Sequence, residues 1–275
     1  MMKKFLSVLL VTILLFTVAS PCFAVPPSAA DIDLALLRRG YPSAVVERMA
    51  PQEKLEHYYE PELVYMDSFS LGYSENRQDN SMQPYGQIST DDLTLYFDLF
   101  YVATDGILDF ILVYFYYNWE QIPVFRWQDP IAISWDDTKF RLHGQYFHKA
   151  DKYSCVIPNM DGSHTWVFDE LHSFEDGYAI ASPAGVAWYA DLKGDIGMVV
   201  TELYGYGSFR LTAAHGTTVY EGESSTLYAH YVHPTASLSA SINVAAFGSF
   251  SVSCAGGYDE RGTHHTFTIS DSTTE

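Results

Sequence analysis

The sequence predicts an all-β protein, mainly an antiparallel β-sandwich of the Greek-key or jelly-roll type, with a small helical segment near the N-terminus. Two observations carry this prediction. The stretch Ile107–Trp119 is rich in β-branched and aromatic residues, and both of its alternating faces are apolar, which is typical of a strand covered on both sides. After residue 194, short alternating segments are separated by turn residues, which is typical of sandwiches and barrels.

Residues 1–24 predict a secretory signal peptide. Lys3 and Lys4 precede an apolar run from Phe5 to Ala19, and small residues precede a cleavage position after Ala24. The alternative is an uncleaved N-terminal helix that holds the protein at the cell surface, although the apolar run is at the short end for a membrane span. We therefore expect a secreted, extracellular protein with no membrane insertion after cleavage.

Residues 25–61 predict a short helical segment. Asp31 is suited to capping a first helix over 31–39, and Gly40 is suited to the position after its end. A second helix is predicted over 43–49, and Pro51 opens a third over 52–59. Helices this short are not stable alone, so they must pack on one another or on a sheet.

Residues 62–275 predict the β-sandwich domain. Asp105-Gly106 lies between two apolar runs and predicts a hairpin that joins residues 92–102 to Ile107–Trp119. Residues 72–90 are polar and predict a long loop. Pro123 and Pro130 cannot donate to a central ladder. The alternation from Ile131 to Asp136 predicts a strand whose odd positions face the core and whose even positions face water.

The remaining strands are predicted from shorter patterns. A change of composition near Gly194 leaves open a second domain boundary there, although one sandwich could use strands from both sides. The expected strands are 62–71, 139–148, 153–157, 164–174, 178–190, 198–204, 208–214, 217–220, 225–232, 236–244, 250–255 and 264–269.

The charge excludes one class of partner. The chain has 15 Lys and Arg against 34 Asp and Glu, a formal net charge of −19, and removal of Lys3 and Lys4 with the signal peptide would make it −21. Such a protein repels nucleic acid. No phosphate-binding or dinucleotide-binding glycine motif is present. We predict no cofactor; acidic turn residues leave Ca²⁺ open, but none matches an EF-hand loop.

Two cysteines follow the predicted signal peptide, Cys155 and Cys254. In an exported protein a pair of cysteines is compatible with a disulfide, and this one would close a loop of about 100 residues worth about 4 kcal/mol in the chain-entropy model. Two free thiols are equally compatible with the sequence, because the distance between the residues cannot be read from it.

The usual catalytic and metal-binding motifs are missing from the sequence. His230 and His233 have a familiar metal-ligand spacing, but they lie in a predicted strand, where residues i and i+3 face opposite ways. There is no HExxH and no GxSxG. We predict no metal site and name no catalytic residue. With 34 acids, a carboxylate pair of the glycosidase type is left open.

The aromatic residues are the weak candidates for binding. Trp119, Trp127 and Trp135 are eight residues apart and share one strand parity, with Asp136 beside the last. Exposed, they would form the aromatic platform on which β-sandwich modules bind sugars. The alternative is that each ring fills the core.

These observations favour a non-catalytic extracellular binding module whose partner is a glycan or a cell-surface protein. The alternatives are a secreted hydrolase acting on polysaccharide or peptide, and a structural protein associated with the envelope. A cleft with two carboxylates of perturbed pKa would favour the hydrolase, whereas an exposed aromatic strip would favour the binding module. The ligand and the oligomeric state are left open.

Overall fold

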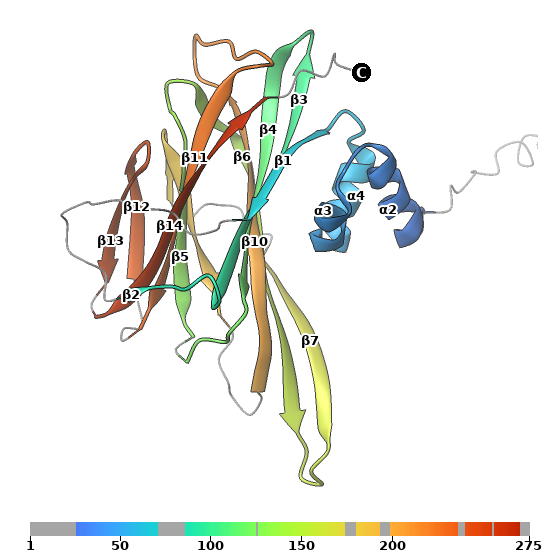
Figure 1. The fold of residues 1–275 in the computed structure, drawn as a ribbon, viewed down its shortest axis with the longest axis vertical. Coiled ribbons are helices and arrows are strands. Elements are labelled where there is room, and N and C mark those ends of the chain that lie inside the picture. Colours follow the sequence, from blue (N-terminus) through green and yellow to red (C-terminus); the bar gives the residue numbers. More distant parts are fainter. Residues whose placement is uncertain are drawn as a thin grey trace, which may run out of the picture. The chain divides into compact units, whose positions relative to one another are not determined.

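The computed structural model describes residues 26–70, 86–124, 126–173, 180–192, 199–235, 240–254 and 256–269. The predicted signal peptide and most of the predicted loop over 72–90 lie outside these ranges. The chain forms two compact units, Met1–Tyr59 and Glu60–Glu275 (Figure 1).

From residue 26 on, the N-terminal unit has three short helices, α2 (Ala29–Arg38), α3 (Ser43–Arg48) and α4 (Pro51–Tyr59). The predicted cap is wrong by three residues. Ser28 is the N-cap of α2, and Asp31 completes a capping box, because each side chain accepts a hydrogen bond from the backbone N–H of the other. Gly40 follows the helix with φ +85°, as its predicted position requires.

The second unit is built from two six-stranded sheets that face one another in a sandwich (Figure 1). All neighbouring strands are antiparallel except β14 and β2. Sheet A has the order β1-β3-β4-β10-β6-β7, with bounds β1 (Val64–Ser70), β3 (Leu93–Thr104), β4 (Ile107–Trp119), β10 (Val199–Ala213), β6 (Phe140–Pro158) and β7 (His164–Ser173). Sheet B has the order β2-β14-β11-β5-β9-β8, with bounds β2 (Gly86–Gln87), β14 (Tyr258–Thr268), β11 (Ser224–Pro234), β5 (Gln128–Ser134), β9 (Gly185–Asp191) and β8 (Ile180–Ser182).

Strand β4 has the predicted bounds and the predicted two-sided burial. Ile111, Val113 and Phe115 lie in the core between the sheets, each fully buried. On the other face Leu112 and Tyr114 are also buried. The hairpin from β3 to β4 is confirmed, because Asp105 and Gly106 adopt positive φ angles of 53° and 75°, as a tight primed turn requires.

The predicted water-facing side of the strand after Pro130 is wrong. Ala132 and Ser134 are fully buried. A hairpin of β12 (Ala240–Ala246) and β13 (Ser249–Cys254) covers this face of sheet B, and Ile242 and Val244 pack with Ala132 (Figure 1). The period-two pattern records which side chains are large, whereas small side chains such as alanine and serine fit beneath a covering hairpin as well as in water.

Pro130 also lies inside β5, a central strand, rather than ending it. The backbone ladder between β5 and β11 stops at Ile131, so the missing N–H of Pro130 interrupts no bond on that side.

Two strands are longer than predicted. The two strands predicted over 139–148 and 153–157 correspond to one strand, β6 (Phe140–Pro158), and those predicted over 198–204 and 208–214 correspond to one strand, β10 (Val199–Ala213). Gly205 and Gly207 lie within β10, at positions where a Cβ would collide with Tyr117 and Trp188 respectively. Residues 217–220 form no strand and contribute one isolated bridge, between Tyr220 and Ile107.

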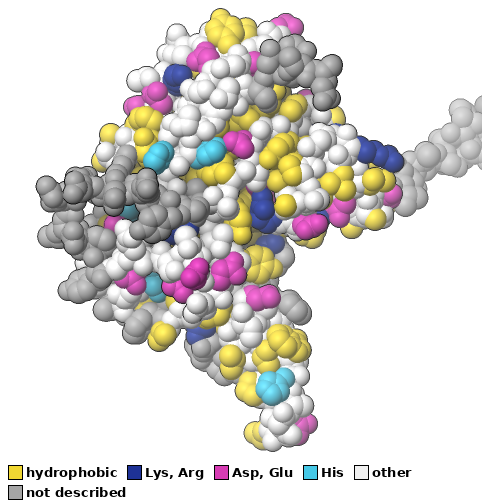
Figure 2. All heavy atoms as spheres, in the orientation of Figure 1, with side chains coloured by type: hydrophobic (Ala, Val, Ile, Leu, Met, Phe, Trp, Pro, Cys, Tyr) yellow, Lys and Arg dark blue, Asp and Glu magenta, His cyan; other side chains and the backbone are white. Residues whose placement is uncertain are grey.

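The β6–β7 hairpin continues beyond the start of β10 as a two-stranded projection (Figure 1). We call residues 156–166 the finger. Its turn lies at residues 159–162, between the strands predicted over 153–157 and 164–174, with Gly162 at φ +79°. Hydrophobic side chains gather along this projection in the space-filling view (Figure 2).

Candidate functional site

Two regions of the second unit carry chemistry beyond ordinary packing. One is a network of buried polar side chains between the sheets. The other is a row of exposed apolar side chains on the finger.

The first half of the buried network is centred on Asp129 of β5, which is fully buried. Its Oδ2 accepts a hydrogen bond from the hydroxyl of Tyr231 at 2.8 Å and lies 2.9 Å from Nδ1 of His233. An ionised carboxylate can only accept, so Nδ1 of His233 carries the proton in this contact. The indole N–H of Trp119, from sheet A, donates to the Tyr231 hydroxyl at 3.1 Å and thereby joins the two sheets.

The second half is centred on Asp151 of β6, which is 4% exposed. It accepts from the hydroxyl of Tyr117 at 2.7 Å and from the backbone N–H of Asp191 in sheet B at 3.1 Å. Lys149 lies 3.5 Å from the same carboxylate and donates to the backbone carbonyl of Tyr189 at 3.0 Å. The rings of Tyr117 and Tyr231 are 5.8 Å apart, so the two halves are adjacent.

Burial dominates the electrostatics of the network. It raises the pKa of Asp129, and the hydrogen bonds from His233 and Tyr231 offset this only in part. Burial also raises the pKa of Asp151, with the charge of Lys149 acting in the opposite direction. The pKa values of both tyrosines, Tyr117 and Tyr231, are raised well above the ordinary value, first by burial and then by the neighbouring carboxylates.

This arrangement suits a structural connection between sheets better than a reaction. A carboxylate–histidine pair is the arrangement of a general base, but a base must come within hydrogen-bond reach of its substrate. The His233 side chain is 6% exposed and Asp129 is sealed. Every oxygen of Asp129 is taken by its own neighbours. In the described ranges, no group of three or more His, Cys, Asp or Glu side chains is placed to hold a metal ion.

The exposed row lies across three strands of sheet A. Trp166 of β7 pairs with Val156 of β6, and Val156 pairs with Val199 of β10. Directly paired residues share one face of a sheet, so the three side chains are neighbours. Trp166 is 62% exposed and Val199 is 57% exposed, while Val156 is buried between them. Met160, at the tip of the finger, is fully exposed.

The same face continues toward the body of the sheet with mixed polar and aromatic groups. Ser154 donates to the carboxylate of Glu202 at 2.6 Å. One row further on, the ammonium of Lys152 lies 5.7 Å from the ring centre of Tyr204, which is 38% exposed. An apolar patch therefore has a polar border on the side of the sandwich.

The structure does not bring the three predicted tryptophans together on a surface. Trp119 and Trp135 are buried, in agreement with the alternative that these rings fill the core. The indole N–H of Trp135 donates to the carbonyl of Pro183 at 3.1 Å. Trp127 is 39% exposed, and its backbone carbonyl accepts from Leu192.

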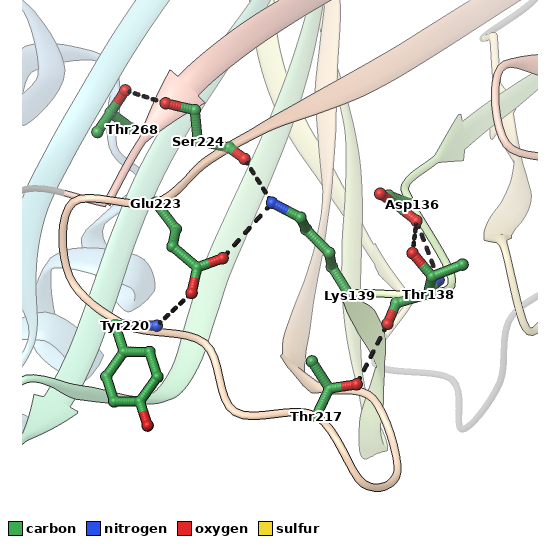
Figure 3. A network of polar contacts seen from close by, with 8 residues as sticks. All are labelled: Asp136, Thr138, Lys139, Thr217, Tyr220, Glu223, Ser224 and Thr268. Carbon is green, nitrogen blue, oxygen red and sulfur yellow. Dashed lines mark hydrogen bonds and ion pairs between the residues drawn. The ribbon is translucent and has the colours of Figure 1, made fainter.

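The carboxylate of Asp136 is used in the hydrogen bonds of a turn. Its carboxylate accepts from the backbone N–H of Thr138 at 3.0 Å and from the hydroxyl of the same residue at 2.6 Å (Figure 3). In the same region Lys139 reaches Glu223, and Thr217 donates to the carbonyl of Thr138. Local hydrogen bonds of this kind stabilise a turn and leave the side chain less available to a ligand.

No disulfide joins the two cysteines. Cys155 is fully buried in β6 of sheet A, and Cys254 is half-buried in β13, and both are free thiols. The two strands belong to different sheets. Of the two alternatives that the sequence left open, this structure has the pair of thiols.

The two histidines face opposite ways, as predicted for residues i and i+3 of a strand. His230 and His233 lie on opposite faces of β11, where one bonds Glu260 at 2.8 Å and the other bonds Asp129. Sequence reasoning missed Trp166 and Val199, because both lie in short alternating segments with no special spacing. For Trp166 the turn at residues 159–162 is a signal, because a residue just beyond a tight turn tends to be exposed, whereas Val199 has no such signal.

The comparisons with known proteins add little. No family model matches the chain, and a search of curated proteins finds no match. A search of solved structures finds AvmM, which catalyses macrocyclization in alchivemycin A biosynthesis; it is 14% identical, and the match covers 67% of this chain and 92% of AvmM with a TM-score of 0.29. A likeness at this TM-score carries no argument about fold or activity. Among the helices described, none is long and apolar enough to cross a membrane.

Proposed function

We propose that the protein is an exported, non-catalytic binding module that holds a protein partner at the cell surface or outside the cell through the finger. The observation that carries this proposal is the apolar row of Trp166, Val156 and Val199, whose two outer members are exposed, with the exposed Met160 at the tip. The residues before Val25 support the export, because they have the layout of a signal peptide.

The chemistry of the finger favours a protein over a glycan. Tryptophan and methionine are enriched at the centres of protein interfaces, and clustered exposed apolar side chains mark such sites. A sugar platform alternates aromatic rings with side chains that bond hydroxyls. On the finger, the residues paired with Trp166 across the strands are the aliphatic Val156 and Val199, and polar side chains lie one row away on either side, His164 toward the tip and Ser154 with Glu202 toward the sandwich.

A hydrolase is the second candidate, because Asp129 and Asp151 are two carboxylates with raised pKa values in one network. Its substrate would have to reach two carboxylates that are 0% and 4% exposed and already bonded to tyrosine hydroxyls. The exposed row needs no such rearrangement to meet a partner. The geometry therefore supports binding better than hydrolysis.

The test uses the full chain against two arrays, one of extracellular proteins and one of glycans. Trp166→Ser removes the largest exposed ring of the finger, and Trp127→Ser is the matched control at the other exposed tryptophan. We expect binding to a protein that falls at least about tenfold with Trp166→Ser and is unchanged with Trp127→Ser, since central tryptophans are typical hot spots. Binding confined to glycans, or binding that ignores Trp166, would contradict the proposal.

A further inference from the structure

The four edge strands of the two sheets differ in how well they are protected, within the part of the chain that the structure describes. Long, regular edges with unpaired backbone groups attract further strands, and natural proteins shorten, bulge or charge them. In sheet B, the edges β2 and β8 have two and three residues. In sheet A, β1 has a register shift between Tyr65 and Asp67. These three strands are short or irregular, but β2 pairs only with Asp259 and Glu260 of β14, so residues 261–268 of β14 form a second, shorter open edge among the described strands.

Strand β7 is a longer and more regular edge than these. It has 10 residues, it pairs with β6 over its whole length without a register shift, and it contains neither lysine nor proline. No other described strand pairs with its far side. It therefore presents the longest regular edge among the described strands.

The hairpin turn determines which backbone groups of β7 face outward. The backbone N–H of Asn159 donates to the carbonyl of Ser163 at 2.8 Å, so this pair is a hydrogen-bonded one. Hydrogen-bonded and non-bonded pairs alternate in an antiparallel ladder. Pro158 and His164 are then a non-bonded pair, and so are Val156 and Trp166. It follows that the even-numbered residues from 164 to 172 direct their N–H and C=O away from β6.

The occupant is selected by charge. The sequence of β7 has neither Lys nor Arg, and the whole chain has a formal net charge of −19. A second copy of the chain would bring the same excess of negative charge, whereas a basic strand would be attracted. The exposed ring of Trp166 lies on the same strand and offers apolar contact to alternate side chains of an added segment.

We propose that the outer edge of β7 binds an extended, basic polypeptide segment by strand addition. This rests on the proposed function in one respect only, that the partner is a protein held at the finger. It specifies the contact as backbone hydrogen bonds from the outward groups of β7, with the side chain of Trp166 as a secondary contact.

The probe is a labelled ten-residue peptide of alternating lysine and valine, titrated into the full chain by fluorescence anisotropy. A peptide of the same sequence, N-methylated on the alternate residues that would donate, keeps the charge and removes the hydrogen bonds. A peptide of alternating glutamate and valine keeps the strand propensity and reverses the charge. We expect binding of the first peptide and at least about tenfold weaker binding of the other two.

The matched variants are Phe168→Pro and Phe168→Val. Proline at 168 removes an outward N–H and leaves the ladder to β6 intact, as tolerated on an edge strand, whereas valine keeps the N–H. Thermal melting of both variants reports whether the sandwich still folds. We expect the proline variant to weaken peptide binding roughly tenfold and the valine variant to stay within about twofold of wild type.

Two results would overturn the proposal. One is wild-type protein that binds none of the peptides. The other is binding of the lysine–valine peptide that is the same in Phe168→Pro or that survives N-methylation, since the contact would then be charge alone. If Trp166-dependent protein binding persists on the array while either result is found, the strand-addition proposal fails and the binding function stands.

Discussion

His233 and Asp129 face one another across two neighbouring strands at the point where the backbone ladder between these strands has ended. The last backbone pair between β11 and β5 is Tyr231 with Ile131, and Pro130 follows with no N–H to donate. Two residues further on in the same register, His233 and Asp129 continue the pairing through their side chains at 2.9 Å. A side-chain bond therefore extends the sheet past the proline.

The pKa of Asp129 predicts a pH dependence of stability. Burial raises this pKa in the folded state above the ordinary value of 3.8, so the folded protein holds the proton to higher pH than the unfolded chain does. The stability that this proton adds to the fold is fully present below pH 3.8. It is lost as the pH rises through the folded pKa of Asp129, and the free energy of unfolding then falls by at most about 1.4 kcal/mol per pH unit. The amide of Asp129→Asn does not ionise, so the variant does not lose this stability as the pH rises.

We therefore expect Asp129→Asn to gain stability relative to wild type as the pH rises above about 4, measured by urea unfolding at a series of pH values. Asp136→Asn, at a half-exposed turn, is the control for changing an aspartate to its amide. A difference between Asp129→Asn and wild type that stays constant with pH would show that the carboxylate keeps an ordinary pKa in the fold.

Tyr231→Phe tests the junction between the sheets. The hydroxyl of Tyr231 donates to Asp129 and accepts from the indole of Trp119, so its removal leaves two buried groups without a partner. We expect a loss of about 1–3 kcal/mol in the free energy of unfolding. The double variant Tyr231→Phe with Trp119→Phe should lose less than the sum of the two single changes, because they remove the same bond. If the losses of the two single variants added up fully in the double variant, Tyr231 and Trp119 would not share a hydrogen bond.

The elements that could be predicted from sequence are those whose signal is local. Strand β4 was placed to the residue, because its run of aromatic and β-branched side chains is long and is preceded by Asp105-Gly106. The ends of the three helices agree with the prediction within two residues, because caps and prolines are local signals.

The features that were missed depend on distant contacts. Ala132 and Ser134 resemble water-facing residues until the hairpin of β12 and β13, more than 100 residues later in the chain, covers them. Asp129 belongs to no catalytic or metal-binding motif in the sequence. Its partners, Tyr231 and His233, come from a strand whose register with β5 no local pattern encodes.

Gly207 illustrates a second kind of distant constraint. Its φ is not positive, so the residue is required by space alone: a Cβ on Gly207 would lie 2.5 Å from Cζ2 of Trp188, which is buried in the opposite sheet. We expect Gly207→Ala to lower the free energy of unfolding by about 1–3 kcal/mol through displacement of the indole. Gly144→Ala is an informative comparison, because there the space is open but φ is +63°. A stable Gly207→Ala variant would show that the facing sheets separate easily.

Phe115 tests the core face of β4. The ring is fully buried and packs against Phe97, with ring centres 4.9 Å apart, and against Trp188 in sheet B. We expect Phe115→Ala to cost about 3–5 kcal/mol from lost transfer energy and a cavity, seen as a lower urea midpoint. A cost below about 1 kcal/mol would mean that the core collapses around the missing ring.

Ala132→Asp tests the hairpin of β12 and β13 as a cover of sheet B. Ala132 is fully buried against Ile242 and Val244, so an aspartate there would place an unpaired carboxylate in an apolar layer. We expect a loss of several kcal/mol, a large fraction of the roughly 5–15 kcal/mol that holds a domain folded. Ala246→Asp, at an exposed position of the same hairpin, should change stability by less than about 0.5 kcal/mol. If the two variants had the same melting temperature, the hairpin would not cover the sheet and Ala132 would be exposed to solvent.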